Sequence, residues 1–172
     1  MKESTIDSDF EKLKEAIHFI FDIEAIHISP GTALETVSLN RILWEADTRS
    51  YIASRKSITN ESYVKTLSGP IANRTNVALR SLEEKHLLEF CAPLQWFPIT
   101  LLETYSPEFL HESEIDIIEE SVSIILKGDI EQKDELWRLA SNGEHLPLFI
   151  SLAKFGEVSE KHLEWANRQR VP

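Results

Sequence analysis

The sequence predicts a mainly α-helical fold: a compact single domain of six or seven helices with one short winged-helix-like strand segment. Its 172 residues, 42% of them hydrophobic, can close one hydrophobic core without disulfides or a structural metal. Apolar residues recur at helical spacing along most of the chain. No internal repeat, low-complexity segment or linker rich in Gly, Ser and Pro separates two domains. We therefore expect residues 1–172 to form one domain.

The first helix is predicted over residues 8–23. Asp7 or Ser8 can accept hydrogen bonds from the free amide groups at its start. Its apolar stripe consists of Phe10, Leu13, Ile17, Ile20 and Phe21.

A long helix is predicted over residues 33–55. It follows the Pro30-Gly31 turn, and Thr32 with Glu35 has the spacing of a capping box. The core face of this helix is formed by Leu39, Ile42, Leu43 and Ala46.

The centre of the chain is organised differently. A short helix over residues 60–66, a stop at Ser68-Gly69-Pro70 and a second helix to His86 are followed by the short apolar run Leu87-Leu88-Glu89-Phe90. This order of helix, turn, helix and strand resembles a winged-helix unit.

After Pro107 the pattern predicts another helix, which Gly128 ends. Its apolar face consists of Ile115, Ile118, Val122 and Ile125, and its opposite face is acidic, with Glu112, Glu114, Asp116, Glu119 and Glu120. A further helix is predicted over residues 131–141, ending at Asn142-Gly143, and an amphipathic helix over residues 158–168.

The net charge is −11, which makes general binding to nucleic acids or anionic membranes a poor first hypothesis. Residues 38–86 carry eight Lys and Arg against five Asp and Glu, so the centre is basic and both ends are acidic. The lone Cys91, the absence of a basic and apolar leader, and the absence of a long apolar run favour the cytoplasm. We expect no membrane association.

No motif indicates catalysis. The five glycines form neither a phosphate loop nor a GxGxxG pattern, and the six histidines are scattered without metal-ligand spacing. His111 beside Glu112 and Glu114 is better explained by acids at a helix N-terminus. Cys91 has no adjacent His or Lys to lower its pKa. We therefore predict no catalytic residue, no metal and no cofactor.

Trp44, Asp47 and Tyr51 lie on one stripe of the long helix. As a recognition site, the aromatic rings supply contact area and Asp47 a charge-assisted hydrogen bond. The alternative is a packing stripe in which Asp47 accepts bonds from neighbouring backbone, Arg74 or Arg80. The predicted binding residues are Arg41, Trp44, Asp47, Tyr51, Tyr63, Lys65, Gly69, Pro70, Asn73, Arg74 and Arg80.

Short motifs follow one another in a set order. They are Leu39-Asn40-Arg41-Ile42-Leu43-Trp44-Glu45-Ala46-Asp47, then Tyr51, then Ser57-Ile58-Thr59 and Tyr63, then Ser68-Gly69-Pro70-Ile71. This order resembles the SocA-like antitoxin domain family, also called Panacea, over residues 33–149. Ser57 and Ser68 depart from the proline and the aromatic residue that the family commonly has there.

The resemblance implies a helical domain that neutralises a neighbouring toxin by direct contact, in a bacterium, an archaeon or a phage. Some members of the family also deliver the toxin to a AAA+ protease. The interface would be the basic centre or, against a basic toxin, the acidic face of the helix after Pro107. The alternatives are a winged-helix-like DNA-binding regulator and an enzyme whose site is assembled from distant residues.

Overall fold

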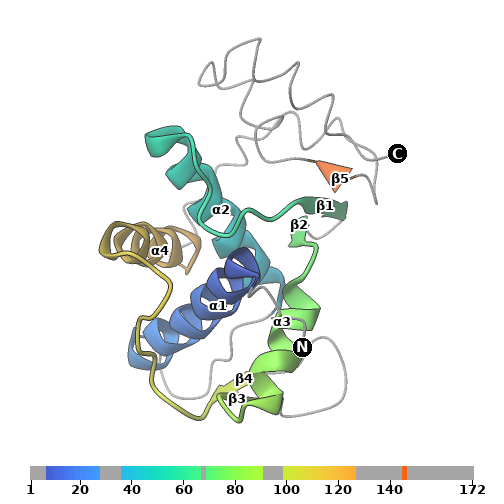
Figure 1. Ribbon diagram of the computed structural model, residues 1–172, viewed down its shortest axis with the longest axis vertical. Coiled ribbons are helices and arrows are strands. Elements are labelled where there is room, and N and C mark those ends of the chain that lie inside the picture. The colour runs from blue at the N-terminus through green and yellow to red at the C-terminus, as the bar shows by residue number, and fades with distance from the viewer. Residues whose placement is uncertain (1–6, 28–35, 67–68, 91–98, 127–144, 147–172) are drawn as a thin grey trace, which may run out of the picture.

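The structure is a computed structural model that describes residues 7–27, 36–66, 69–90, 99–126 and 145–146 (Figure 1). This part of the chain is mainly helical, as the sequence predicts, with four helices and short strands. In chain order the elements are α1 (Ser8–His27), α2 (Thr36–Ser54), β1 (Tyr63–Thr66), β2 (Gly69–Ala72), α3 (Thr75–Glu84), β3 (Leu88–Phe90), β4 (Ile99–Leu101), α4 (Glu112–Leu126) and β5 (His145–Leu146).

Several predictions fall outside the described residues. They concern the Pro30-Gly31 turn, the capping box of Thr32 and Glu35, Cys91, the helix end at Gly128, the helices at 131–141 and 158–168, and the Asn142-Gly143 turn. No helix within the described ranges is long and apolar enough to cross a lipid bilayer.

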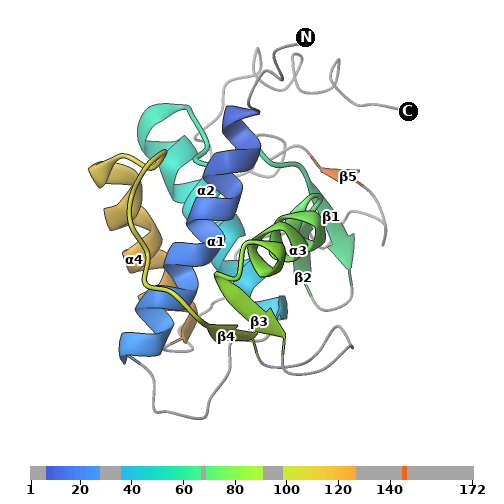
Figure 2. The ribbon, with the colours of Figure 1, turned by 60° about the horizontal axis from the view of Figure 1, so that its bottom comes forward.

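Helix α1 is the central element of the molecule. It packs against α2, α3 and α4, which surround it in Figure 2. Leu13, Ile17 and Ile20 are fully buried, as the helical spacing predicts. The helix starts where Asp7 Oδ1 accepts a hydrogen bond of 3.1 Å from the amide of Phe10. The prediction of residues 8–23 is therefore confirmed, and the helix continues to His27.

Helix α2 packs against α4 and β2. Its predicted core face is confirmed, because Leu39, Ile42, Leu43 and Ala46 are all buried. The helix ends before Arg55, which has a φ of 62° and so leaves the right-handed helical region.

The predicted helix at residues 60–66 is wrong. Strand β1 pairs with β2 as an antiparallel hairpin, and β5 covers the other edge of β1. The physical reason is twofold. Tyr63, Val64 and Thr66 favour strand conformation, and the segment before them is held by side chains of α2. The predicted second helix is confirmed as α3 only from Thr75, because Gly69–Ala72, where we expected it to begin, form β2. The predicted strand at its end is β3, which pairs with β4.

The outer edge of β2 cannot extend the sheet. The amide of Ala72 donates a hydrogen bond of 2.8 Å to Asn40 Oδ1 and therefore points away from β1. Residues 70 and 72 share that edge, because amide directions alternate along an antiparallel strand. Residue 70 is proline, which has no N–H to donate. Asn40 and Pro70 together block strand addition at this edge.

The fully buried carboxylate of Asp47 connects α2 to the segment before β1. Its Oδ1 accepts the amides of Ile58 and Thr59 at 2.8 and 2.9 Å. Its Oδ2 accepts the hydroxyls of Thr59 and Tyr63 at 2.5 and 2.6 Å. Burial raises the pKa of the Asp47 carboxyl, and these hydrogen bonds oppose the rise. Burial and the neighbouring Asp47 raise the pKa of Tyr63 well above its usual 10.0.

We predict that Asp47→Asn lowers the free energy of unfolding by about 2–4 kcal/mol. The amide nitrogen of Asn is a donor, and the hydroxyls of Thr59 and Tyr63, which now donate to Oδ2, would have to reorient to accept from it. Urea denaturation followed by circular dichroism measures the change. The control is Asp116→Asn on an exposed site, which we expect to change the value by less than about 0.5 kcal/mol. Equal effects of the two substitutions would contradict the role given to Asp47.

Candidate partner-binding surface

One stretch of the chain carries charge of a single sign. Residues 99–126 contain seven Asp and Glu and no Lys or Arg. They form β4, a connecting segment and α4. The apolar face of α4 is confirmed, with Ile118 and Val122 buried and Ile115 and Ile125 packed against the core. The carboxylates of this helix therefore lie on its outer side.

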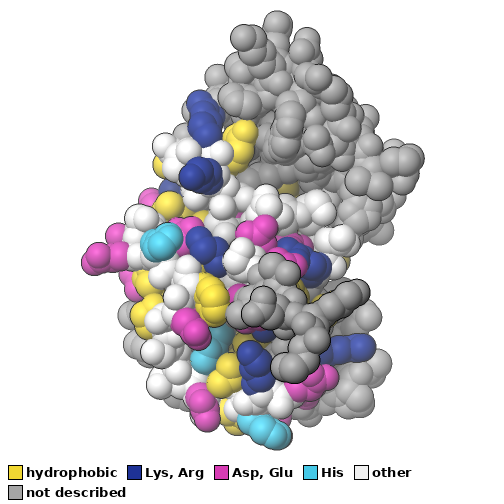
Figure 3. All heavy atoms as spheres, in the orientation of Figure 1, with side chains coloured by type: hydrophobic (Ala, Val, Ile, Leu, Met, Phe, Trp, Pro, Cys, Tyr) yellow, Lys and Arg dark blue, Asp and Glu magenta, His cyan; other side chains and the backbone are white. Residues whose placement is uncertain are grey.

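Two of the seven carboxylates have cationic partners. Lys12 binds Glu114 at 2.6 Å, and Arg49 binds Glu120 at 3.0 Å. Within the described ranges no ion pair involves the other five, and all five are exposed. We call them the acidic surface: Glu103, Glu108, Glu112, Asp116 and Glu119. Figure 3 shows carboxylate side chains in magenta gathered at the left edge, over α4.

A strap, residues 103–110, crosses α1 and leads into α4. The nearly buried Glu15 of α1 holds it with four accepted hydrogen bonds. The donors are the hydroxyl of Tyr105 at 2.6 Å and the amides of Glu108, Phe109 and Leu110 at 2.7, 2.5 and 3.2 Å. These donors compensate the buried charge, so Glu15 fixes the path of the strap.

The start of the strap is held against α1 by contacts of His18 and Phe19. His18 Nε2 lies 2.8 Å from the carbonyl oxygen of Glu103, and the ring centroid of Tyr105 lies 4.7 Å from that of Phe19. Burial and the adjacent Glu15 raise the pKa of Tyr105 far above its usual 10.0. The hydroxyl therefore remains a donor to Glu15 at neutral pH.

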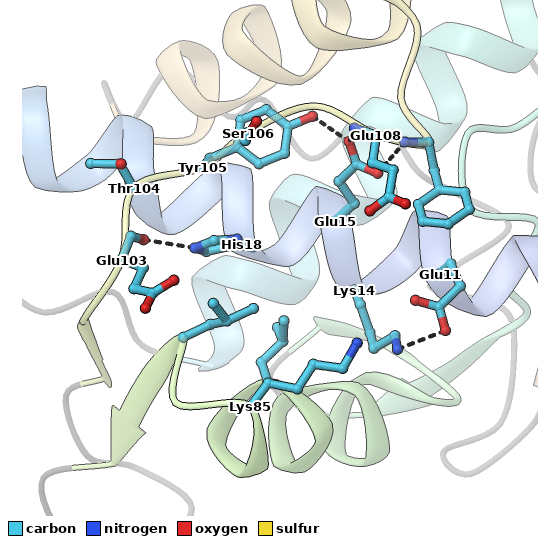
Figure 4. A pocket seen from close by; sticks show the side chains of 13 residues that line it. Glu11, Lys14, Glu15, His18, Lys85, Glu103, Thr104, Tyr105, Ser106 and Glu108 are labelled. Atoms are coloured by element: carbon cyan, nitrogen blue, oxygen red, sulfur yellow. Dashed lines mark hydrogen bonds and ion pairs between the residues drawn. The ribbon is translucent and has the colours of Figure 1, made fainter.

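The strap, α1 and the end of α3 enclose a pocket of about 240 Å³ (Figure 4). Helix α3 ends in a Schellman motif: the amides of His86 and Leu87 donate to the carbonyls of Glu83 and Leu82, and His86 has a φ of 58°. This turn places Lys85 and Leu87 on the pocket wall opposite the strap.

The basic centre predicted as an interface is mostly used inside the molecule. Asp47 and Tyr63 are 0% exposed, which matches the alternative in which Asp47 accepts bonds from neighbouring backbone; Arg74 and Arg80 are not its partners. Arg74 instead binds Glu61 and Asp7 and lies over the ring of Phe10.

The remaining predicted residues of the basic centre do not form one exposed face. Arg41, Trp44 and Tyr51 are half-buried and have interactions of their own. Three further residues belong to the β1–β2 hairpin, and two more are exposed, one just before α3 and one on it. The three on the hairpin are Lys65, Gly69 and Pro70, and the two exposed ones are Asn73 and Arg80.

The exposed side of α3 is close to neutral. Arg80 and Lys85 are balanced by Glu83 and Glu84, and Val77 is 59% exposed among them. A helix that enters the major groove of DNA needs an excess of positive charge on this side.

Three buried polar side chains were not predicted from the sequence: Glu15, Asn40 and Glu61. A signal existed for Glu15 and Asn40, since each adjoins the apolar stripe of its helix: Glu15 lies between Leu13 and Ile17. Their partners, however, lie up to 95 residues away, and helical spacing says nothing about them.

Among the described residues, no group of three or more His, Cys, Asp or Glu could hold a metal ion. Comparison of the chain with protein-family models, with curated proteins and with solved structures finds no match. Membership of the SocA-like family therefore stays a prediction.

We predict that Tyr105→Phe lowers the free energy of unfolding by about 1 kcal/mol at neutral pH, because the bond to Glu15 is lost. The raised pKa means that the folded state retains the proton more strongly than the unfolded state. The contribution is then fully present below pH 10 and is lost as the pH rises above it. Urea titrations of both proteins at about pH 7, 9 and 11 test this. A difference in free energy of unfolding between the two proteins that is larger at about pH 11 than at about pH 7 would contradict this prediction.

Proposed function

We propose that this chain is an antitoxin: a cytoplasmic protein that neutralises a basic toxin by direct contact through the acidic surface, without catalysing a reaction. The observation that carries the proposal is the set of five exposed carboxylates without ion pairs in the described structure, on a stretch that contains no Lys or Arg. The resemblance of residues 33–149 to the SocA-like family suggests the class of partner.

Helix stability alone does not explain this distribution of charge. Glu112 and Glu114 lie in the first turn of α4, where they complement the helix dipole. Asp116, Glu119 and Glu120 lie beyond that turn. Glu112 and Asp116, which have no ion pair in the described structure, are a like-charge pair at i,i+4, which destabilises a helix by about 0.2–0.5 kcal/mol. The acidic surface therefore lowers the stability of α4, and a binding role explains why the chain carries it.

Electrostatics favours a basic partner. A protein that acts on RNA or nucleotides presents a positive surface to phosphate groups. The net charge of −11 and the acidic surface would attract such a protein over a distance of about one Debye length, roughly 8–10 Å. Attraction of this kind raises the association rate and makes it dependent on salt.

The DNA-binding alternative has one structural observation in its favour, since α3 is followed by the β3–β4 hairpin, as in a winged helix. The near-neutral exposed side of α3 argues against it. An electrophoretic mobility shift with the upstream region of the gene, compared between the wild type and Arg80→Glu, separates the two functions.

We predict that Asp116→Lys together with Glu119→Lys abolishes neutralisation. The experiment expresses the adjacent open reading frame alone and with each form of this chain in a bacterial host, and counts colonies. The reversed charges would repel a basic toxin while the fold persists, since both residues are exposed.

The matched control is Glu83→Lys together with Glu84→Lys on α3, which changes the net charge by the same amount at exposed sites. We expect this control to neutralise as the wild type does. Equal loss in both double variants would indicate an effect of total charge, and full neutralisation by the α4 variant would refute the proposed interface. A neighbour that stays toxic when the wild type is present would refute the antitoxin function for that pair.

A further inference from the structure

The pocket under the strap lies next to the acidic surface. Two carboxylates of the acidic surface, those of Glu103 and Glu108, belong to its lining. Its volume of about 240 Å³ is below the roughly 300–1,000 Å³ of pockets that hold whole small-molecule ligands. A recess of this size suits one long side chain.

Two of the charged groups in the pocket are compensated internally. Glu15 accepts four hydrogen bonds from the strap. Lys14 binds Glu11 at 2.8 Å, and its Nζ lies 5.1 Å from the ring centroid of Phe10. The Lys14–Glu11 pair has no net charge, whereas the Glu15 carboxylate keeps its negative charge with its hydrogen-bonding capacity already used.

The groups that stay exposed give the pocket a negative balance. Glu103 and Glu108 lie toward the two ends of the strap, and the exposed Lys85 lies on the opposite wall of the pocket (Figure 4). Tyr105 and Phe109 add aromatic rings to the same lining. Carboxylates next to aromatic rings favour a planar cation, which can donate hydrogen bonds and stack at the same time.

We infer that this pocket binds one arginine side chain of the partner protein. The inference rests on the proposed function for the source of that side chain. A basic partner would approach along the acidic surface, and its arginine would enter beside Glu103 and Tyr105. Arginine is enriched among the residues that dominate protein interfaces because it combines charge, planarity and apolar area. Lys85 weakens the site and sets its selectivity.

The test uses the peptide N-acetyl-Gly-Arg-Gly-amide as a probe, with N-acetyl-Gly-Gln-Gly-amide as its neutral counterpart. Each is titrated into the ¹⁵N-labelled full chain at constant ionic strength, and amide shifts are followed. We expect saturable shifts at the pocket, at Leu82, Leu87 and Thr104, with the arginine peptide only. Shifts that do not saturate, or equal shifts with the glutamine peptide, would overturn the inference.

A gain of affinity provides a second readout that loss of folding cannot imitate. Lys85→Glu replaces the opposing ammonium group with a carboxylate, and we expect it to strengthen binding of the arginine peptide about two- to fivefold. Lys56→Glu makes the same change of charge at an exposed site outside the pocket and serves as its control. Glu103→Gln should weaken binding by a similar factor, while Glu83→Gln should not. Equal affinities of Lys85→Glu and Lys56→Glu would overturn the inference.

Failure of this inference is distinguishable from failure of the proposed function. If the charge reversals on α4 abolish neutralisation but the arginine peptide does not bind, the pocket is refuted and the acidic interface stands. If the peptide binds and the α4 reversals neutralise fully, the pocket is a cation site and the acidic interface is refuted.

Discussion

The buried carboxylate of Asp47 is the constraint on which the centre of the fold depends. A charge without solvent contact is stable only where hydrogen bonds surround it, and four donors from residues 58–63 do so here. Three of those donors come from the segment between α2 and β1, and the fourth is the hydroxyl of Tyr63, the first residue of β1. The requirement to satisfy one side chain therefore determines where β1 starts, and with it the position of the hairpin and of the helix that follows.

The same arrangement occurs at two further places. The buried Asn40 of α2 accepts hydrogen bonds from the amide of Ala72 and the hydroxyl of Thr75. It thereby positions β2 and the start of α3. Glu15 of α1 accepts the donors of the strap. In each case a polar side chain on a helix accepts hydrogen bonds from backbone amides that have no partner in a helix or sheet, and so fixes the path of that connection. The helices form the frame, and these three side chains set the paths of the segments between them.

This division explains how far the sequence predicts the structure. Helices α1, α2, α3 and α4 are predicted because their apolar stripes repeat at local spacing, as Leu39, Ile42 and Ala46 do. The hairpin is not predicted, because the partners of Asp47 lie 11 to 16 residues away and the short run from Tyr63 to Thr66 fits either a helix or a strand. Local preference is decided there by a tertiary contact.

The candidate site divides in the same way. The acidic side of α4 is predictable, because Glu112, Asp116 and Glu119 share one helix and one face. The pocket is not, since Glu15 and Phe109 are 94 residues apart and meet only through the strap. The basic centre was predicted from residues that are close in sequence, and the structure turns Asp47 and Tyr63 inward. Proximity along the chain predicts a shared surface only where one regular element carries all the residues.

The buried carboxylates stabilise the fold, whereas the exposed carboxylates of the acidic surface are available for binding. Asp47 and Glu15 are buried, and their hydrogen bonds are made within the chain, so removing either leaves donors unpaired inside the core. The carboxylates of the acidic surface are hydrated, and neighbouring like charges repel one another. Neutralising the exposed set should therefore leave the fold intact or strengthen it slightly, while binding of a basic partner weakens. When a partner of opposite charge covers such a surface, its cations relieve the repulsion between the carboxylates, and this favours the complex.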